Sequence, residues 1–556
     1  EMVRKEMLKQ YGTKIYTDGY KVYTTINSQF QETAQQAVVN GLMAYDQRHG
    51  YRGPEQQLTL ETTGAENHEQ LKQLWLTTLA SSGEPAGLIP AVVSAIEEQS
   101  FTALFADGNE INIAWEQGLK GARRFETANI RGPNPRQASD VVAVGDLIRL
   151  KQKDDQLWHL SQIPSAQAAL VSVNADNGAI QALVGGFNYQ QSKFNRITQA
   201  TRQPGSNFKP FIYTAALANG YTAASIINDA PIVFEDTELE SSWRPTNDGG
   251  KFYGPTRLRH ALFKSRNLVS IRLLRGLGIP KAINYVERFG FDSAQLPRDL
   301  SLALGSHSLT PLQIVSGYAV LANGGYSVQA YLIQRIDDVN GEVLFEAMPN
   351  TVCRDCDKLI DPPQDTVSAE LATIEDILQQ AEEKPKPTLP NAQQVIEPRV
   401  AYIIDTMLRD VVKKGTGRRA KSIGRQDLAG KTGTTNGPTD AWFSGYGGGI
   451  ATTAWLGFDR NNRLGNREYG GSAALPIWID YMKVALKGRP EITPKQPDGL
   501  VTVKIDPTTG LLAKPGQSNA IFEIFREELA PQQEADIEAI SGDTSQIEEV
   551  MQEDIF

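Results

Sequence analysis

The chain has 556 residues, with 55 Lys and Arg against 65 Asp and Glu, and therefore a formal net charge of −10. A chain of this length is expected to form about three to four domains with more than one hydrophobic core. Its composition, 40% hydrophobic and 22% charged, is that of a globular protein and excludes a fibrous or wholly disordered chain. The acidic balance and the lack of a long basic run argue against a nucleic-acid partner.

The acidic excess is concentrated at the C-terminal end. Residues 515–556 contain eleven Asp and Glu and a single Arg, so the rest of the chain is charge-balanced. We expect residues 514–556 to form a solvated acidic tail that lies outside any catalytic machinery.

The sequence opens at Glu1 within a charged helical pattern, EMVRKEMLKQYG. We interpret residues 1–18 as the end of a helical domain, with its linker, that lies before this sequence. No apolar run approaches the roughly 18 residues of a membrane span, and no signal-peptide pattern is present.

Residues 19–86 predict a strand, a helix and a connection. Polar residues first alternate with apolar or β-branched ones, which is a strand pattern, and Asn27 and Ser28 then offer an N-cap for a helix that runs to about Asp46. Residues 87–164 consist of short β runs broken by Gly, Asn and Asp, with a hairpin signal at 107–109. This pattern predicts a small OB-like β-barrel, and because the segment is not basic we favour a protein-interaction or spacer role.

Residues 165–513 form the largest region and predict an α/β fold. A strand–turn–strand pattern surrounds 176–178, long helical patterns follow, and two more strand patterns lie within 440–459. Residues 346–395 interrupt the region with six prolines and many charges, which predicts a flexible surface insert.

The insert contains the only two cysteines, Cys353 and Cys356, in a Cys-x-x-Cys pair. A small local disulfide and a pair of solvated thiols both fit this spacing. A redox or zinc site is disfavoured, because a polar, proline-containing stretch follows and the five His show no ligand spacing. An oxidising compartment would favour the structural bridge.

The first motif with chemical potential is Ser206-x-x-Lys209, followed by Pro210. Proline is tolerated in a helix only within the first turn, so Ser206 is expected at or next to a helix N-terminus, which favours developing negative charge. One turn separates Ser206 from Lys209, so their side chains share a face, and a buried neutral Lys beside a Ser is a workable base–nucleophile pair. Taken alone, this motif is most often a solvated helix face.

A later motif is Lys431-Thr432-Gly433. A P-loop is excluded there, because the preceding glycine has the wrong spacing and no helix pattern follows. A strand fits better, with Lys431 and Gly433 on one face and Thr432 and Thr434 on the other. Gly433 would then let the backbone of a ligand approach closely.

Between these motifs lies Ser265-Arg266-Asn267, in a helical stretch that is uninformative by itself. The ordered triple Ser-x-x-Lys, Ser-x-Asn and Lys-Thr-Gly is much more specific than any member. The stretches around it, RQPGSNFKPFIYTAAL, WRPTNDGGKFYGPTRLRHALFKSRN, LALGSHSLTPLQIVSGYAVLANGG and AGKTGTTNGPTDAWFSGY, resemble the transpeptidase domain of class A, bifunctional penicillin-binding proteins. The 1a type is the most similar, and the resemblance extends from about Gly19 to about Ala513.

The resemblance implies a penicillin-binding/serine β-lactamase-like α/β (α+β) domain, an antiparallel sheet with helices, and an OB-like β-barrel inserted before the active-site Ser. It also implies that a glycosyltransferase domain and a membrane anchor precede Glu1, at the periplasmic face of the bacterial inner membrane, with this part of the chain soluble. Regulatory envelope proteins are the expected partners of the OB-like domain. We recognise no counterpart for the 346–395 insert or the acidic tail.

By resemblance, the donor is a peptidoglycan stem peptide that ends in D-Ala-D-Ala. Ser206 would attack the penultimate D-Ala carbonyl while Lys209 takes its proton, and the backbone amides of Ser206 and Thr434 would form the oxyanion hole. Ser265, with Lys431 nearby, would protonate the departing D-Ala. An amine from a neighbouring strand would then resolve the acyl-enzyme and cross-link the cell wall.

The resemblance assigns the remaining motif residues to substrate binding. Asn267 would hold the acyl amide. The donor carboxylate would be bound by the strand that contains Gly433, through Lys431, Thr432 and Thr434. A β-lactam would acylate Ser206 in place of the donor. Arg266, where β-lactamases have Asp, is expected to point away from its neighbours and to have no chemical role. No metal or cofactor is implied.

Two other functions remain open at this point. In a β-lactamase or D,D-carboxypeptidase, water would replace the amine, although the size of the chain and its OB-like insertion argue against both. In a non-catalytic β-lactam sensor or scaffold, the acylated domain would only signal. Turnover of a penicillin, and cross-linking of a lipid-linked substrate to a separate amine, distinguish the three.

Overall fold

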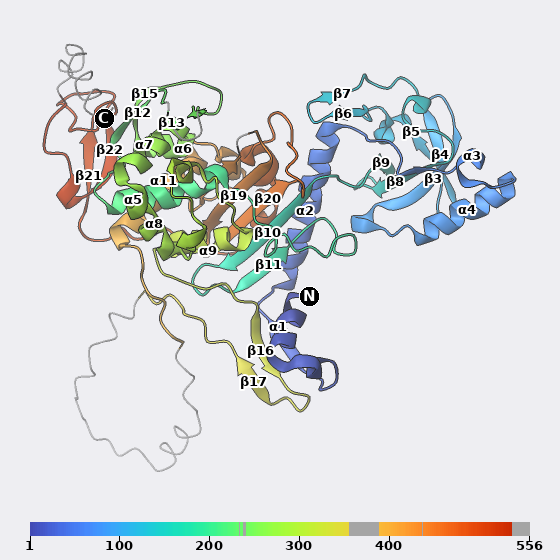
Figure 1. Ribbon diagram of the computed structural model, residues 1–556, viewed down its shortest axis with the longest axis horizontal. Coiled ribbons are helices and arrows are strands. Elements are labelled where there is room, and N and C mark those ends of the chain that lie inside the picture. Colours follow the sequence, from blue (N-terminus) through green and yellow to red (C-terminus); the bar gives the residue numbers. More distant parts are fainter. Residues whose placement is uncertain (233, 237–240, 355–388, 436, 536–556) are drawn as a thin grey trace.

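The structure is a computed structural model that describes residues 1–556 except 233, 237–240, 355–388, 436 and 536–556. A large α/β body and a smaller β-rich body lie on either side of the long helix α2 (Ser28–His49) (Figure 1). This helix begins where the sequence predicts, because the Asn27 side chain accepts a hydrogen bond from the Phe30 amide at 3.0 Å. In the described part of the chain, no helix combines the length and apolarity needed to cross a membrane.

A five-stranded antiparallel sheet forms the centre of the large body. Its strand order is β11–β10–β20–β19–β18, which makes β18 an edge strand. Strands β19 and β20 are buried along their whole length, because helices cover both faces of the sheet. The strands are β10 (Gln167–Asn174), β11 (Ile180–Val184), β18 (Ala429–Thr434), β19 (Asp440–Gly447) and β20 (Ile450–Gly457).

Alternation of side chains along the strands gives each face of the sheet its own hydrophobic core. In β10, Ala169, Val171 and Val173 belong to the core on one face, whereas Ala168 and Leu170 belong to the core on the other. The second face is covered by α2 and α12 (Leu475–Ala485). The first face is covered by α5 (Lys209–Ala218), α6 (Leu258–Lys264), α7 (Asn267–Leu277), α8 (Ile279–Val286), α9 (Pro311–Ala322) and α11 (Pro398–Lys413).

The smaller body is a curved antiparallel sheet in the order β2–β8–β3–β4–β5, with β9 also paired to β8. The hairpin predicted at 107–109 is confirmed, since β4 and β5 pair on either side of Gly108, which has a φ of +82°. Among the described residues, β5 pairs only with β4 and β9 only with β8, so the predicted barrel is not closed. The strands are β2 (Gln56–Gln57), β3 (Ile89–Ile96), β4 (Ser100–Leu104), β5 (Glu110–Ala114), β8 (Asp146–Gln152) and β9 (Trp158–Ser161).

This body starts earlier in the chain than the predicted boundary at 87. Leu71, Trp75 and Leu79 of α4 (His68–Ser81) pack against β3, β4 and β8 of this sheet, and Trp75 Nε1 donates to the Leu58 carbonyl at 2.8 Å. The prediction used β patterning to mark the domain, and a helical segment carries no such pattern. The additional elements are α3 (Leu60–Thr63), α4 (His68–Ser81) and the hairpin β6 (Phe125–Thr127) with β7 (Ile130–Arg131).

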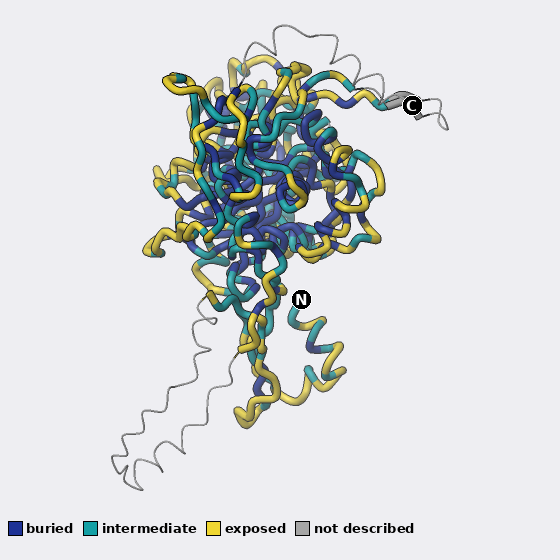
Figure 2. The backbone as a smooth tube through the Cα atoms, turned by 90° about the vertical axis from the view of Figure 1, so that its left-hand side faces the viewer, coloured by how far each residue is buried: buried dark blue, intermediate teal, exposed yellow. Residues whose placement is uncertain are grey.

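Smaller sheets complete the described part of the fold. The predicted N-terminal strand is confirmed as β1, which pairs with β16, and this sheet and α1 project from the large body (Figure 2). Two hairpins, β12–β15 and β13–β14, lead into α6. The elements are α1 (Met2–Tyr11), β1 (Lys21–Thr24), β12 (Ile226–Asp229), β13 (Phe234–Asp236), β14 (Ser241–Trp243), β15 (Gly254–Arg257), β16 (Ile333–Asp337) and β17 (Val343–Glu346).

The C-terminal segment differs from the predicted solvated tail. Strands β21 (Leu500–Ile505) and β22 (Ile521–Arg526) form a hairpin. Glu523 of β22 is 2% exposed and forms ion pairs with Arg257 at 3.5 Å and Arg259 at 2.6 Å. A count of charges along the chain cannot detect such pairing, so the predicted boundary at 514 lies too early.

The ends of the predicted insert at 346–395 are attached to the large body. The Val352 amide donates to the Asp176 carbonyl at 2.8 Å, Gln394 forms a β-bridge with Tyr326, and Cys353 is disulfide-bonded. Residues 355–388 of the insert, which include Cys356, lie outside the described residues, as do residues 536–556 of the predicted tail.

Candidate active site

Ser206 lies where the sequence places it, just before a helix. It belongs to the 3₁₀ turn Gly205–Phe208, which leads directly into α5, and Pro210 occupies the first turn of that helix. Gly205 has a φ of +55°, and a Cβ there would lie 2.5 Å from the Thr434 carbonyl oxygen. Glycine is therefore required for the turn to approach β18 so closely.

Lys209 is fully buried at the start of α5. Its Nζ donates to the Ser265 carbonyl at 2.9 Å and to Asn267 Oδ1 at 2.7 Å. Burial, reinforced by the charge of Lys431, holds the pKa of Lys209 well below its usual range. The Ser206 hydroxyl has no hydrogen-bond partner among the described residues, so its proton is not committed elsewhere.

Ser265 interrupts what the sequence predicts as a continuous helical stretch. Helix α6 ends at Lys264 and α7 begins at Asn267, with Ser265 in the left-handed region at a φ of +61°. The Asn247 side chain causes the new start, because its Oδ1 accepts from the Asn267 amide at 2.8 Å. The break turns the Ser265 hydroxyl toward β18.

Lys431 meets Ser265 from the other side. Its Nζ donates to Ser265 Oγ at 2.8 Å and to the Thr432 carbonyl at 3.0 Å. The side chain is fully buried, and burial lowers the pKa of Lys431 to about 7. Two buried lysines thus converge on one serine, and their nitrogens make these hydrogen bonds to uncharged groups.

The free edge of β18 faces the Ser206 turn. Thr435 N donates to the Asp440 carbonyl at 3.3 Å, which makes these two residues a hydrogen-bonded pair of the β18–β19 ladder. Bonded and non-bonded pairs alternate, so Thr434 is in a non-bonded pair and its N–H points away from β19. The amide of Thr434 therefore points to the edge at which Gly205 and Ser206 lie.

The two threonine side chains of β18 point away from Lys431, as the strand alternation predicts. Thr432 Oγ1 lies 2.7 Å from Thr416 Oγ1, and Thr434 Oγ1 accepts from the Gly470 amide at 3.1 Å. Both threonines line the cavity described below.

The predicted reason for Gly433 is wrong. A Cβ at this position would lie 2.4 Å from the Pro204 carbonyl oxygen and 2.7 Å from the Asn207 Cβ. The segment that needs the space is thus the chain's own Ser206 turn rather than the backbone of a ligand. The sequence motif could not identify the neighbour, which is more than 200 positions away in the chain.

A cavity of about 950 Å³, which we name the Ser206 cavity, opens in front of these groups. Lys209 and Lys431 do not line it and lie behind the serines. Other lining residues had no role in the sequence analysis, notably Asn247, Arg418, Arg419 and Arg467. Of the predicted site residues, the cavity is lined by Ser206, Ser265, Asn267, Thr432 and Thr434.

Asn247 is the most informative residue that the motif search passed over. It lies in the quoted stretch WRPTNDGG, which is the signal that could have identified it. Its Nδ2 donates to Asp229 Oδ1 at 2.6 Å, while its Oδ1 caps α7. Arg266 points away from the cavity, as predicted, with its guanidinium 3.3 Å from the centre of the Tyr253 ring and 3.8 Å from Asp229.

Comparisons with known proteins agree with this geometry. The family model described as "Penicillin binding protein transpeptidase domain" matches residues 168–447, and the one described as "Penicillin-binding protein OB-like domain" matches residues 51–166. The chain is 48% identical over 551 residues to "Penicillin-binding protein 1A" of Pseudomonas aeruginosa. The chain belongs to the penicillin-binding protein 1A family.

The alignment with the Pseudomonas relative covers 96% of this chain and 64% of that protein, so the chain spans about two thirds of its length. "Penicillin-binding protein 1A" of Escherichia coli is 41% identical, over 96% of this chain and 67% of its own. The crystal structure of penicillin-binding protein 1A from Haemophilus influenzae superimposes with a TM-score of 0.83 at 36% identity, over 96% of this chain and 76% of that one. The OB-like match from residue 51 agrees with the early start of the smaller body.

Proposed function

We propose that this chain carries a serine D,D-transpeptidase that cross-links peptidoglycan stem peptides through an acyl-Ser206 intermediate. One observation carries the proposal, namely that two buried lysines with lowered pKa values converge on Ser265 beside Ser206. The family assignment and the transpeptidase match support the same chemistry.

The hydrogen bonds of Lys209 suit a general base. A neutral amine has two N–H groups and one lone pair, and both N–H groups are used by the Ser265 carbonyl and Asn267 Oδ1. The lone pair is then free to take the proton of Ser206 as its oxygen attacks the penultimate D-Ala carbonyl. The amides of Ser206 and Thr434 receive the oxyanion, a contribution of about 3–4 kcal/mol per donor.

Ser265 and Lys431 serve the leaving group and the donor carboxylate. Ser265 Oγ accepts from Lys431 and therefore keeps its own proton to donate to the departing D-Ala amine. The proton that Lys209 took from Ser206 then replaces the one that Ser265 has lost, so that Lys209 is neutral again when the acceptor arrives. In its protonated form Lys431 carries a positive charge behind Ser265 that attracts the terminal carboxylate, and Thr432 and Thr434, which line the cavity, bind that carboxylate. Asn267 positions the acyl amide. A β-lactam enters the same cycle as an acylating agent at Ser206.

We assign an N-terminal glycosyltransferase and a membrane anchor at the periplasmic face of the inner membrane to the whole protein. The relatives extend beyond the region that this chain matches, which supports the assignment. Regulatory envelope proteins at the OB-like domain remain part of the same proposal.

The deciding experiment treats the protein with a penicillin and locates the added mass by peptide mass spectrometry. We expect the adduct on the peptide that contains Ser206, persistence for hours, and no labelling of Ser206→Ala. A lipid-linked donor with a separate amine acceptor should then give a cross-linked product. Release of the penicillin within minutes would indicate a hydrolase, and acylation without any cross-linking would indicate a sensor.

A further inference from the structure

A second cavity of about 580 Å³ lies next to the Ser206 cavity, at the boundary of the two bodies. Its walls come from the C-terminal end of α2, the β6–β7 hairpin and the loop after β20, which meet at the upper end of α2 in Figure 1. Arg419, Arg467 and Ser472 line both cavities. The two cavities are therefore neighbours that share one wall.

The second cavity is strongly cationic. Its one acidic lining residue, Glu468, is bound by Arg48 at 2.8 Å and by His49 at 3.2 Å. Three other arginines line the cavity, and within the described residues none of the three pairs with a carboxylate. We name these the arginine wall, which consists of Arg131, Arg419 and Arg467.

The loop that carries Arg467 is held in place by the smaller body. The Asn466 amide donates to Asn129 Oδ1 at 2.5 Å, and a Cβ on Gly465 would lie 2.5 Å from the Ala128 carbonyl oxygen. Arg467 itself has a φ of +67°, a strained conformation for a residue with a side chain. Such strain persists only where surrounding contacts impose it, and it is concentrated at binding sites.

We propose that the arginine wall binds the carboxylates of the acceptor, an acidic peptide that carries the attacking amine. The inference rests on the proposed function, because it concerns the second half of the same reaction. A guanidinium binds a carboxylate through paired, charge-assisted hydrogen bonds, so arginines without a carboxylate partner fit an anionic ligand. A peptide held in the second cavity lies beside the Ser206 cavity, because Arg419, Arg467 and Ser472 line both.

The transfer step balances without any further reactant. The acceptor amine attacks the acyl carbonyl, a new amide bond forms, and the ester bond to Ser206 Oγ breaks. The amine loses one proton to Lys209, which returns a proton to Ser206 Oγ. Water needs no carboxylate site, so a wall of this kind distinguishes a transferase from a hydrolase.

The test uses one D-Ala-D-Ala peptide donor and two acceptors. One acceptor is a tripeptide whose diaminopimelate residue offers an amine and free carboxylates, and the other is the same tripeptide with its carboxylates amidated. We expect the wild-type chain to prefer the free carboxylates, and Arg419→Gln and Arg467→Gln each to reduce that preference about tenfold. The preference should also fall as salt is raised.

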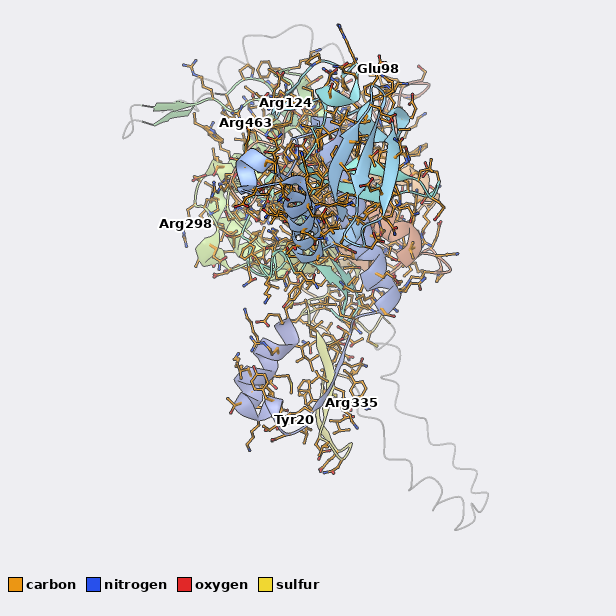
Figure 3. All side chains as sticks on the ribbon, turned by 90° about the vertical axis from the view of Figure 1, so that its right-hand side faces the viewer. Tyr20, Glu98, Arg124, Arg298, Arg335 and Arg463 are labelled. Carbon is orange, nitrogen blue, oxygen red and sulfur yellow. The ribbon has the colours of Figure 1, made fainter. Side chains whose placement is uncertain are left out.

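Arg298→Gln is the matched control, because Arg298 is exposed (Figure 3) and lines neither cavity. An unchanged preference in both wall variants would overturn this inference while leaving transpeptidation intact. Failure of the wild-type chain to transfer to either amine would instead overturn the proposed function.

Discussion

Helix α6 has a buried cluster of basic side chains at each end, and the two clusters differ in whether carboxylates bind them. At its N-terminal end, Arg259 is bound by Glu523 at 2.6 Å and by Asp410 at 3.3 Å. Burial opposes the charge there, but these carboxylates outweigh it and raise the pKa of Arg259. At the C-terminal end, Lys209 and Lys431 are buried among uncharged partners and their pKa values fall.

The difference separates a basic side chain that holds the fold together from one that can take part in proton transfer. A paired arginine stays charged, locks the C-terminal hairpin to α6 and cannot exchange protons near neutral pH. A lysine buried without a counter-charge becomes a base, and the fold bears the free-energy cost of that burial. The comparison can be tested by changing each cluster in turn.

The largest effect is expected for Lys209→Met, which keeps the length of the side chain and removes the amine. Loss of a positioned general base should lower the rate constant of penicillin acylation by about 10²- to 10⁴-fold. The thermal midpoint should stay the same or rise, because a buried amine is replaced by an apolar group. Fluorescent-penicillin labelling and thermal unfolding measure the two quantities.

Lys281→Met is the control, since Lys281 is an exposed lysine on α8. A loss of both acylation and stability in Lys209→Met would place this lysine with the basic side chains that hold the fold together. The contrast between the two ends of α6 would then fail.

The next effect is expected at the other end of α6. Glu523→Gln leaves Arg257 and Arg259 buried without their main counter-charge, and should lower the free energy of unfolding by about 3–5 kcal/mol. Adding Arg259→Met should restore part of the loss, because the uncompensated charge is then removed. Urea unfolding measures both variants.

Glu527→Gln provides the comparison, because Glu527 is exposed on the same segment and should change the free energy of unfolding by less than about 0.5 kcal/mol. Equal effects of the two substitutions would mean that the buried ion pairs do not hold the hairpin.

Local patterns predicted much of this molecule. The N-cap at Asn27, the hairpin around Gly108 and the position of Pro210 depend on neighbours in the chain, and all three are confirmed. The motif residues also gather at one cavity, because short motifs of this family preserve the groups that must meet.

The features that sequence reasoning missed depend on distant partners. The helix break at Ser265 requires Asn247, 20 positions before Asn267, to cap the second helix. The burial of Glu523 requires two arginines from β15 and α6. Neither partner is visible in a local window, and charge counting placed Glu523 in a solvated tail for this reason.

A smaller effect is expected for Gly433→Ala. The added Cβ would lie 2.4 Å from the Pro204 carbonyl oxygen, so the turn that carries Ser206 must move. A displacement of about 1 Å at a nucleophile can lower a rate by about 10²-fold, and we expect penicillin acylation to fall by up to that factor. Gly121→Ala, at a position with open space around it, is the control. Unchanged acylation would show that the turn tolerates the shift.

The smallest effect is expected in the pH dependence of donor binding. The pKa of Lys431 is lowered to about 7 by burial, so its side chain is protonated below pH 7 and neutral above it. Attraction for a donor carboxylate should therefore be present at low pH and should be lost as the pH rises through 7. The second-order rate constant for a penicillin with a free carboxylate should fall about tenfold relative to that for its methyl ester, which lacks the charge. Comparing the ratio of the two rate constants cancels the titration of Lys209, which affects both compounds equally. A ratio that stays constant from pH 5 to 9 would mean that Lys431 does not bind the carboxylate through its charge, and would leave hydrogen bonding to Ser265 as its remaining contribution.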